Sequence, residues 1–222
     1  AQPSMSRHAS FKDIFDTLYA HYGPQHWWPA ETHFEVMIGA VLVQNTAWHN
    51  ASKAIDNLKN AGLMSAVAIR DTPGDRLAQL IISSGYFNIK ARRLQALCVW
   101  LLEKGDIAAL KEQSLNFLRK DLLTIHGIGN ETADDILLYA LEKPFFVIDA
   151  YTWRLFSRLG LVEHDASYKD LQNSFQQALD SDVNLFNEYH ALIVMHGKHT
   201  CQKNPFCMNC CLQQYCADAR QA

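Results

Sequence analysis

The amino-acid sequence predicts an all-α protein of 222 residues. Apolar residues recur at helical spacing along most of the chain, and no segment shows the strict alternation of a half-buried strand. Ser, Thr and Asp, which cap helix N-termini, precede several of these segments, and Gly follows them. Hydrophobic residues make up 49% of the chain and charged residues 19%, which is typical of a globular protein rather than a disordered one.

The first half of the chain carries helix start and stop signals in order. Ser10 can cap a helix that ends at Gly23, and Thr32 and Glu35 have the spacing of a capping box. The helix that this box opens, HFEVMIGAVLVQ, is apolar on nearly all sides, so we expect it at the centre of a core. Further helices are expected from Thr46 to Asn60, from Thr72-Pro73 to Ser84-Gly85, from Asn88 to Lys104 and from Ser114 to Ile125.

The second half continues the same pattern. A helix is expected over residues 130–141, directly after a glycine-containing turn. Asp149 can cap the next helix, which stops at Gly160. Ser167 can cap another that ends near residue 179, and the last long helix covers residues 184–199. The sequence contains no internal repeat, heptad pattern or low-complexity tract, so these helices should pack as ordinary globular units.

The overall charge of the chain, −3 with a pI near 6.4, does not indicate a nucleic-acid-binding protein. The charge is uneven, however, because between residues 86 and 120 seven positive residues stand against three acidic ones, a local charge of +4. These positive residues are Lys90, Arg92, Arg93, Lys104, Lys111, Arg119 and Lys120. A solvated helix face explains such a run, and so does a modest basic face that binds phosphates.

The sequence contains no membrane or export signal that we can identify. No apolar run approaches the roughly 20 residues needed to cross a bilayer. The start of the chain, AQPSMSRH, lacks a charged segment followed by an apolar one, so we expect no signal peptide. We therefore expect an intracellular protein of the cytoplasm or nucleoid, monomeric and without a membrane partner.

The segment over residues 122–151 reads LLTIHGIGNETADDILLYALEKPFFVIDAY. Gly127 and Gly129 bracket Ile128, and glycine allows a tight reversal and the close approach of another backbone. The following helix would begin with its free N–H groups facing out of this turn, an arrangement that binds anions such as phosphate. An ordinary connection between two helices is the alternative.

Five of the six cysteines lie between residues 201 and 216. Cys201, Cys207, Cys210 and Cys216 give the spacing C-x5-C-x2-C-x5-C, and four thiolates on one short loop suit a soft metal centre. Disulfides are a poorer explanation in an intracellular chain. The spacing allows zinc or an iron–sulfur cluster, and Cys211 could replace Cys210 as a ligand. The sixth cysteine lies on an apolar helix and should be a core residue.

The 122–151 segment resembles the helix-hairpin-helix, and the aspartate that follows it, of the endonuclease III superfamily of DNA glycosylases. His126-Gly127-Ile128-Gly129 matches the hairpin, and Asp149, eighteen positions after Glu131, matches the acid. The resemblance implies two lobes with a DNA-binding cleft between them. Residues 29–143 would form a six-helix barrel containing the hairpin, and residues 1–28 and 144–222 would form the second lobe with the cysteine loop.

The resemblance also implies a [4Fe–4S] cluster held by the four cysteines, on a loop that presents Lys198 or Lys203 to phosphate. His196-Gly197-Lys198 resembles the family's approach to the first cysteine. One departure is that the first interval between cysteines is one residue shorter than the usual six. The partner implied is double-stranded DNA containing a damaged base.

Two carboxylates carry the implied chemistry. Asp149 would stabilise the positive charge that develops on the sugar and orient or deprotonate a water, although an aspartate before a helix is often only a cap. Glu131 stands where bifunctional family members have a lysine, and a carboxylate cannot form a Schiff base. We therefore expect a monofunctional glycosylase without efficient AP-lyase activity. Glu131 would suit a cationic base such as 3-methyladenine or 7-methylguanine, or would only stabilise its helix dipole.

Aromatic residues supply a candidate base pocket. Trp27, Trp28, Pro29 and Trp48 could stack on an alkylated purine, although tryptophans are often core residues. Together with Gln44-Asn45-Thr46 and the hairpin, they resemble the endonuclease III-type 3-methyladenine (methylpurine) DNA glycosylases. In that case Gln44 would be the wedge that fills the gap left by the flipped nucleotide.

Two alternative functions stay open. One is a mismatch glycosylase that acts on adenine, thymine or uracil, since such relatives also lack the lysine. The other is a non-catalytic damage-binding protein that uses the hairpin alone. The chemistry of Asp149 separates the enzymes from the binding protein.

Overall fold

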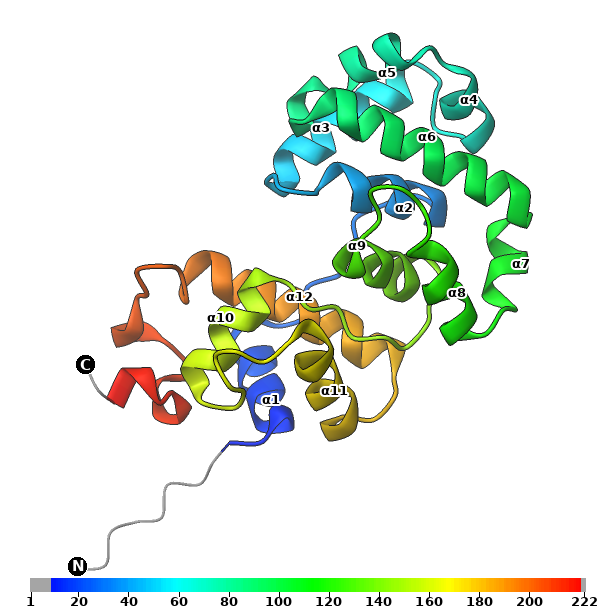
Figure 1. The fold of residues 1–222 in the computed structure, drawn as a ribbon. Helices are drawn as coiled ribbons and strands as arrows, with labels where there is room; N and C mark the ends of the chain where they lie inside the picture. The colour runs from blue at the N-terminus through cyan, green and yellow to red at the C-terminus, as the bar shows by residue number, and fades with distance from the viewer. Residues whose placement is uncertain (1–8, 221–222) are drawn as a thin grey trace, which may run out of the picture. The chain divides into compact units, whose positions relative to one another are not determined.

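The computed structural model describes residues 9–220, and these residues form helices and no strand, as predicted (Figure 1). Residues 1–8, where we expected no signal peptide, lie outside the described residues. The elements are α1 (Phe11–Tyr22), α2 (His33–Leu42), α3 (Trp48–Asn60), α4 (Ala66–Asp71), α5 (Gly74–Leu80), η1 (Ile82–Ser84), α6 (Phe87–Lys104), α7 (Ile107–Lys111), α8 (Leu115–Leu122), α9 (Asn130–Asp135), η2 (Ile136–Ala140), α10 (Ala150–Leu159), α11 (Tyr168–Ala178), α12 (Val183–His199), η3 (Cys207–Asn209), η4 (Gln213–Tyr215) and η5 (Asp218–Arg220).

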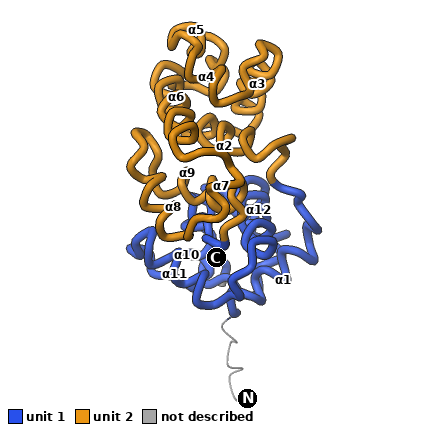
Figure 2. The backbone as a smooth tube through the Cα atoms, turned by 90° about the vertical axis from the view of Figure 1, so that its right-hand side faces the viewer, with its two compact units in different colours: residues 1–27, 144–222 blue, residues 28–143 orange. Residues whose placement is uncertain are grey.

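The chain divides into two compact units (Figure 2). The first comprises residues 1–27 and 144–222, and the second comprises residues 28–143. The chain therefore leaves the first unit once, builds the second and returns. The hairpin and Glu131 belong to the second unit, whereas Asp149 and the cysteine loop belong to the first.

Helix α2 is the centre of the unit 28–143, as its apolar sequence predicts. Every residue from Glu35 to Leu42 is buried, and α2 contacts α3, α6, α9 and η2. The helix ends at Leu42, two residues earlier than expected. Only half of the predicted capping box forms, because one oxygen of the Glu35 carboxylate pairs with Lys59 at 2.9 Å and the other accepts from the N–H of Glu31 at 3.0 Å instead of that of Thr32.

Several element boundaries in this unit differ from the prediction. The N-cap of α3 is Ala47 and not Thr46, whose hydroxyl accepts a hydrogen bond from the Asn50 amide instead. The short helices α4 and α7, six and five residues long, carry too little periodicity to be read from the sequence. The helix predicted over 130–141 changes from α to π geometry at Ile136. Such π segments occur frequently at functional sites.

The first unit is built around aromatic side chains. Helices α1, α10, α11 and α12 surround them, and the rings of Phe146 and Phe175 stack with centroids 4.0 Å apart. The Tyr189 hydroxyl donates a hydrogen bond to the Phe11 carbonyl, so this core also holds α1 to α12. The predicted caps at Ser10, Asp149 and Ser167 all form. Short polar side chains before apolar helices thus located these N-termini correctly.

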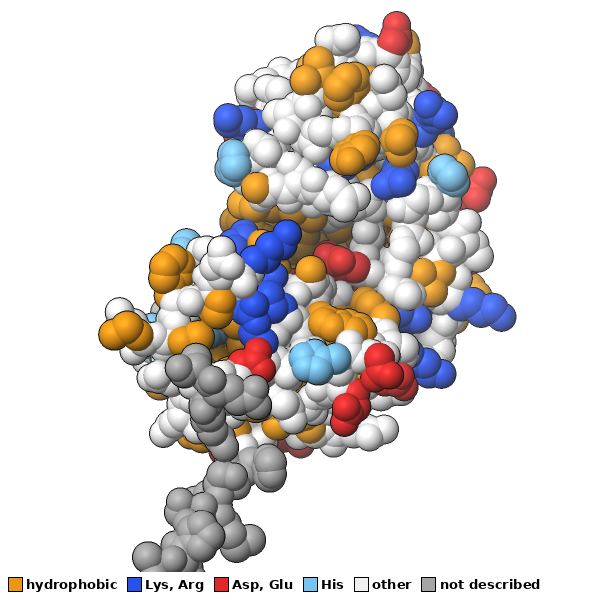
Figure 3. Space-filling model, turned by 60° about the vertical axis from the view of Figure 1, so that its left-hand side comes forward, with side chains coloured by type: hydrophobic (Ala, Val, Ile, Leu, Met, Phe, Trp, Pro, Cys, Tyr) orange, Lys and Arg blue, Asp and Glu red, His pale blue; other side chains and the backbone are white. Residues whose placement is uncertain are grey.

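Most of the seven positive residues between residues 86 and 120, for which the sequence left a solvated helix face or a phosphate-binding face open, have partners in the structure. Lys90 is buried, and Arg93 donates to the Gln44 side chain. Three others have acidic partners: Lys104 with Asp121, Lys111 with Glu142, and Arg119 with Asp134. Arg92, Lys104 and Lys120 of this run are exposed, and of these Lys104 is paired with Asp121. Figure 3 shows Lys and Arg side chains gathered in one run on one face of the molecule and isolated ones elsewhere.

Lys90 allows a prediction about stability and pH. Its Nζ donates to the carbonyls of Leu42 at 2.8 Å and Ser84 at 2.6 Å, which ties α6 to the ends of α2 and η1. Burial, with the nearby charge of Arg93, lowers the pKa of Lys90 from 10.5 to about 8. Between these two pH values the unfolded chain holds a proton that the folded chain has released, so stability should rise with pH.

We expect the unfolding free energy of the wild type to increase relative to Lys90→Met by about 3 kcal/mol as the pH rises from about 8 to 10.5. Urea unfolding of both proteins across this pH range measures the difference, because all other titrating groups are shared. A difference that stays constant with pH would contradict the assignment.

Candidate functional site

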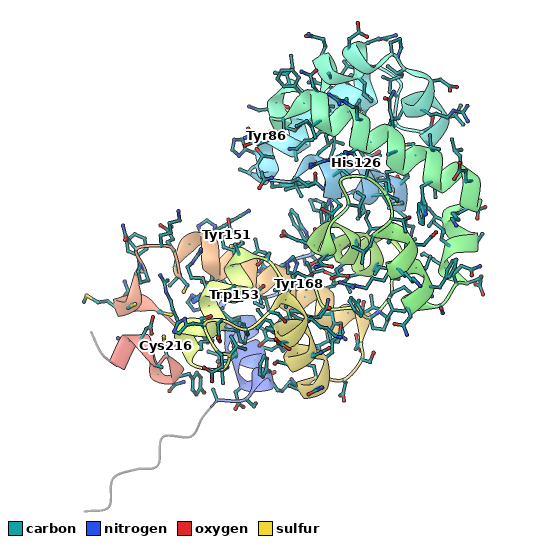
Figure 4. All side chains as sticks on the ribbon, in the orientation of Figure 1. Tyr86, His126, Tyr151, Trp153, Tyr168 and Cys216 are labelled. Carbon is teal, nitrogen blue, oxygen red and sulfur yellow. The ribbon has the colours of Figure 1, made fainter. Side chains whose placement is uncertain are left out.

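The hairpin lies between α8 and α9 and has the glycine geometry that the sequence predicts. Gly127 adopts a positive φ of 83°, which favours glycine. The N–H of Ile128 donates to the carbonyl of Ile125 at 3.1 Å, and the Ile128 side chain is buried. Ile128 therefore anchors the turn from inside, while His126 and Gly129 are exposed (Figure 4 labels His126).

The first glycine of the hairpin makes room for Arg93 of α6. A Cβ on Gly127 would lie 2.3–2.4 Å from the Arg93 side chain, too close for any substitution without movement of Arg93. Arg93 in turn donates from Nη1 to Oε1 of Gln44 at 2.6 Å. The sequence gives no sign of this arginine's role, because Arg93 and Gly127 are 34 positions apart.

Gln44 is fully engaged with the hairpin. Its Nε2 donates to the carbonyl of Gly127 at 3.1 Å and to the hydroxyl of Thr132 at 2.9 Å, and its Oε1 accepts from Arg93. We predicted that Gln44 is a wedge, and this stays a prediction; in the structure its amide holds the hairpin turn. The next residue, Asn45, is exposed and adopts a positive φ of 52°.

No contact within the described chain requires a glycine at the second glycine position of the hairpin. Gly129 is the N-cap of α9 with a φ of −93°, which any residue adopts, and no atom lies within 4 Å of the place where a Cβ would be. The space beside its backbone is therefore open. The continuous helix formed by α9 and η2 begins there, with its first N–H groups next to that space.

A buried ion pair holds the two helices of the hairpin together. Asp134 on α9 is completely buried, and both of its oxygens accept from Arg119 of α8, at 2.8 and 3.2 Å. Arg119 also donates to the Asn130 side chain at 3.2 Å. Bidentate pairing of this kind fixes direction as well as distance, so it sets the angle at which the turn is presented.

Asp149 begins α10 as its N-cap residue. Its Oδ1 accepts from the backbone N–H of Thr152 at 2.8 Å and from the Thr152 hydroxyl at 2.9 Å. Its Oδ2 lies 2.9 Å from Nε2 of His190 on α12. The two oxygens therefore have different surroundings: Oδ1 caps the helix, and Oδ2 faces a histidine. About 10% of the Asp149 side chain is exposed.

Asp149 is ionised at neutral pH. Burial raises the pKa of Asp149, but the hydrogen bond and charge of His190, together with the two hydrogen bonds from Thr152, outweigh burial and hold the pKa below its ordinary value of 3.8. The carboxylate thus carries its negative charge in a poorly solvated place. A negative charge in such surroundings interacts strongly with a positive charge brought near it.

The predicted base-pocket residues are only partly brought together. Trp28 and Trp48 meet edge to face with ring centroids 5.3 Å apart, and Trp28 also contacts Tyr139. Pro29 and Trp48 line an open cavity of about 330 Å³ whose other walls include Glu31, Glu35, Asp56 and Lys59. Trp27 is half-buried and belongs to the first unit, whereas Trp28 and Pro29 belong to the second.

Glu131 is exposed in the first turn of α9, two residues after Gly129. This position suits a carboxylate, because the N-terminus of a helix attracts negative charge. The side chain is therefore presented next to the hairpin turn, as the sequence predicts.

The four predicted cysteine ligands line one cavity. This cavity, of about 130 Å³, lies in the first unit and is lined by Cys201, Cys207, Cys210 and Cys216 but not by Cys211. Among residues 9–220, no three His, Cys, Asp or Glu side chains are close enough together to hold a single metal ion. The thiols are instead spread around a space larger than one ion needs.

Basic side chains hold the cysteine loop in place. Arg158 of α10 lies 3.3 Å from the Cys201 sulfur and donates to the carbonyls of Gln202 and Lys203. Arg154 donates to the carbonyl of Cys201 at 2.8 Å. These contacts bring two guanidinium groups to the loop around Cys201, whereas burial raises the pKa of the Cys210 and Cys216 thiols. Lys198 and Lys203, the predicted phosphate contacts, are both exposed.

In the structure, His196 and Gly197 of the His196-Gly197-Lys198 motif make specific packing and polar contacts. His196 is completely buried, with Nδ1 2.8 Å from the Tyr22 hydroxyl and Nε2 3.5 Å from the Cys210 sulfur. Burial, with the charge of His21, lowers its pKa to about 4, so His196 is neutral and joins α1 to the cysteine loop. A Cβ on Gly197 would lie 2.5 Å from the Tyr151 ring, so the glycine lets α10 pack closely against α12.

Four residues around the site could not be identified from the sequence: His190, Arg93, Arg158 and Tyr86. The first three act through partners more than 30 positions away, which no local pattern reveals. Tyr86 stands out only in the structure, where its backbone has a positive φ of 45°. The residue is 64% exposed. Bulky residues rarely adopt this conformation, and such strain is concentrated at functional sites.

Comparison with known proteins defines the class. The family model for the HhH-GPD superfamily of base excision DNA repair proteins matches residues 38–181. A protein of Methanocaldococcus jannaschii that is provisionally named a DNA repair glycosylase is 44% identical over 206 residues, which cover 91% of this chain and 94% of the relative. Endonuclease III of Sulfolobus acidocaldarius is 30% identical over 185 residues and is covered to 81% by this chain, which is itself covered to 82%.

Solved structures of DNA glycosylases are also similar to this chain. The 3-methyladenine DNA glycosylase MagIII of H. pylori, bound to 1,N6-ethenoadenine, has a TM-score of 0.74 and 30% identity, and the match covers 84% of this chain and 96% of that one. A trapped endonuclease III–DNA covalent intermediate has a TM-score of 0.82 with 21% identity, covers 95% of both chains and shows the shared fold.

The fold, the hairpin and these matches define a base excision repair DNA glycosylase. The chain belongs to the HhH-GPD superfamily, which confirms the resemblance that the hairpin and Asp149 indicated. Among the described residues, no helix is both long and apolar enough to span a membrane.

Proposed function

We propose that this protein is a monofunctional DNA glycosylase that removes alkylated, 3-methyladenine-like purines after flipping them out of double-stranded DNA. One observation carries the proposal: a carboxylate is exposed at residue 131, beside the hairpin, where bifunctional relatives have a lysine. The 30% identity to MagIII, a 3-methyladenine DNA glycosylase, supports the same substrate class.

Asp149 supplies the negative charge that the reaction needs. Breaking the bond between C1′ and the base nitrogen develops positive charge on the sugar, and a nearby ionised carboxylate stabilises that charge. Because hydrogen bonds hold the pKa of Asp149 low, the group is a weak base. Its main contribution is therefore electrostatic stabilisation of the sugar and orientation of the attacking water.

Glu131 accounts for the absence of lyase chemistry. A lyase needs an amine that attacks C1′ and forms a Schiff base, and a carboxylate cannot do this. Its negative charge favours a cationic leaving base, such as 3-methyladenine or 7-methylguanine. These bases already carry positive charge, so they leave with little help from an acid catalyst.

We assign DNA contacts to exposed parts of the unit 28–143, in addition to Lys198 and Lys203 of the first unit. The open space beside Gly129 and the N–H groups that begin α9 fit a phosphate. The exposed ring of Tyr86 can stack on a base. Asn45, next to the hairpin-bound Gln44, is the more accessible of the two for filling a gap in the duplex.

The cysteine loop fits a [4Fe–4S] cluster. Four thiols surround one cavity, two arginines supply positive charge, and His196 approaches Cys210. Bound there by Cys201, Cys207, Cys210 and Cys216, the cluster would hold the loop that carries Lys203 and that follows Lys198 at the end of α12. Iron and sulfide analysis of the purified protein tests this, and a zinc-only result contradicts it. Cys210→Ser should lose the iron and Cys211→Ser should keep it.

Gly129→Ala tests the phosphate site without disturbing the fold. Alanine adopts the backbone angles of Gly129, and its Cβ meets nothing in the described chain, so stability should be unchanged. The methyl group would occupy the space that we assign to phosphate, so we expect affinity for duplex DNA of any sequence to fall about tenfold or more. Gly74→Ala is the matched control, because Gly74 is also exposed with room for a Cβ. Equal affinities for the two variants would remove Gly129 from the interface.

Duplexes that each contain a single lesion test the substrate class. The set should contain 3-methyladenine, 7-methylguanine, 1,N6-ethenoadenine, uracil, and mismatched adenine and thymine. We expect release of the alkylated purines and little release of the others. Release of only mismatched adenine, thymine or uracil would establish a mismatch glycosylase, and DNA binding without any release would establish a damage-binding protein.

A further inference from the structure

Among residues 9–220, His190 is the one side chain from another helix that contacts the Asp149 carboxylate. It lies on α12 and is 7% exposed, and its Nε2 is 2.9 Å from Oδ2 of Asp149. Helices α10 and α12 pack against each other within the same unit, so this contact belongs to the rigid core of that unit. The two residues are 41 positions apart in the sequence.

The hydrogen bonds of Asp149 can be counted. An ionised carboxylate accepts about four hydrogen bonds, two on each oxygen, and donates none. Oδ1 accepts two, both from Thr152. Oδ2 accepts one, and because the carboxylate has no proton, Nε2 of His190 must be the donor. One acceptor position is left, and it is on Oδ2.

We propose that His190 is a positioning residue for the glycosylase reaction, which donates Nε2–H to Oδ2 and thereby leaves that oxygen with a single acceptor position for the water or sugar of the substrate. This inference rests on the function proposed above. It also explains how one aspartate serves as helix cap and reactive group, because each task uses a different oxygen.

A merely structural histidine would behave differently. A side chain that only fills space between α10 and α12 could be replaced by phenylalanine, which has a similar shape. Nε2 is directed at Oδ2, so this nitrogen is placed to position the carboxylate. A positioning residue needs its donor and not its ring, so glutamine, whose Nε2–H extends about as far, should substitute for it.

Single-turnover excision with excess enzyme separates these roles. The substrate is DNA methylated with dimethyl sulfate, which contains both 3-methyladenine and 7-methylguanine. We expect His190→Phe to slow base release by about 10- to 100-fold with little change in the Kd for DNA. His190→Gln should restore most of the rate. Thr152→Val, which removes one of the two bonds to Oδ1 and none to Oδ2, should cause a smaller loss than His190→Phe.

Carbon-13 NMR of the Asp149 carboxyl gives a second readout that needs no activity. The pKa of the Asp149 carboxyl should be higher in His190→Phe than in the wild type. In His190→Gln it should be close to the wild-type value again. Base release by His190→Phe at the wild-type rate would overturn the proposal. Equal losses of rate in His190→Phe and His190→Gln would do so as well. If Asp149→Asn excises normally, the catalytic role of Asp149 fails instead, while the NMR titration still reports whether His190 sets the state of the carboxyl.

Discussion

Asp149→Asn should release damaged bases about 100- to 10,000-fold more slowly than the wild type. The variant removes the negative charge that faces the sugar but keeps a side-chain oxygen that can accept from Thr152, as Oδ1 does now. Asparagine is also a good N-cap, so α10 should stay intact. The new amide would place N–H groups opposite Nε2–H of His190, which removes the contact at the second oxygen.

The measurement is a single-turnover excision assay with DNA binding measured in parallel. We expect the Kd for damaged duplex to change little, because the hairpin contacts lie in the other unit of the chain. Excision at the wild-type rate would remove Asp149 from the mechanism. A parallel loss of binding and excision would indicate that the residue acts in recognition instead.

Asp134→Asn should destabilise the protein by about 3–5 kcal/mol, because it leaves the Arg119 guanidinium beside a buried site without its charged partner. For a protein of this size that corresponds to a fall in Tm of roughly 6–20 °C. The effect is large because Asp134 is completely buried and accepts two hydrogen bonds from Arg119.

Thermal unfolding followed by circular dichroism measures this effect. Asp16→Asn is the matched control, because Asp16 pairs with Lys12 on the surface of α1 and both side chains are more than half exposed. Such surface pairs contribute little, so that variant should melt close to the wild type. Equal melting of both variants would mean that the hairpin does not depend on the buried pair.

Local signals in the sequence predicted the helices well. Ser10, Asp149 and Ser167 cap their helices as expected, because a cap depends on residues only three positions away. Helices α4 and α7 were not predicted because they are shorter than two full turns. The change from α to π geometry at Ile136 depends on packing, which periodicity does not report.

The sites depended on contacts that the sequence does not encode locally. The hairpin and Asp149 could be identified from their pattern, but the engagement of Gln44 with Gly127 spans 83 positions and the partner of Asp149 lies 41 positions away. The choice between Cys210 and Cys211 was open in the sequence, and the structure places only Cys210 at the cavity. A count of charges left open whether the positive run over residues 86–120 is a solvated helix face or a phosphate-binding face, because it does not show which of these residues have acidic partners.

Borohydride treatment during turnover tests the central claim most directly. Wild-type protein is incubated with a duplex containing one 3-methyladenine, and portions are treated with sodium borohydride, with alkali or with neither. A carboxylate at residue 131 beside the hairpin, and no amine there, predicts strand cutting only after alkali and no covalent protein–DNA adduct. A trapped adduct, or cutting without alkali, would contradict the account.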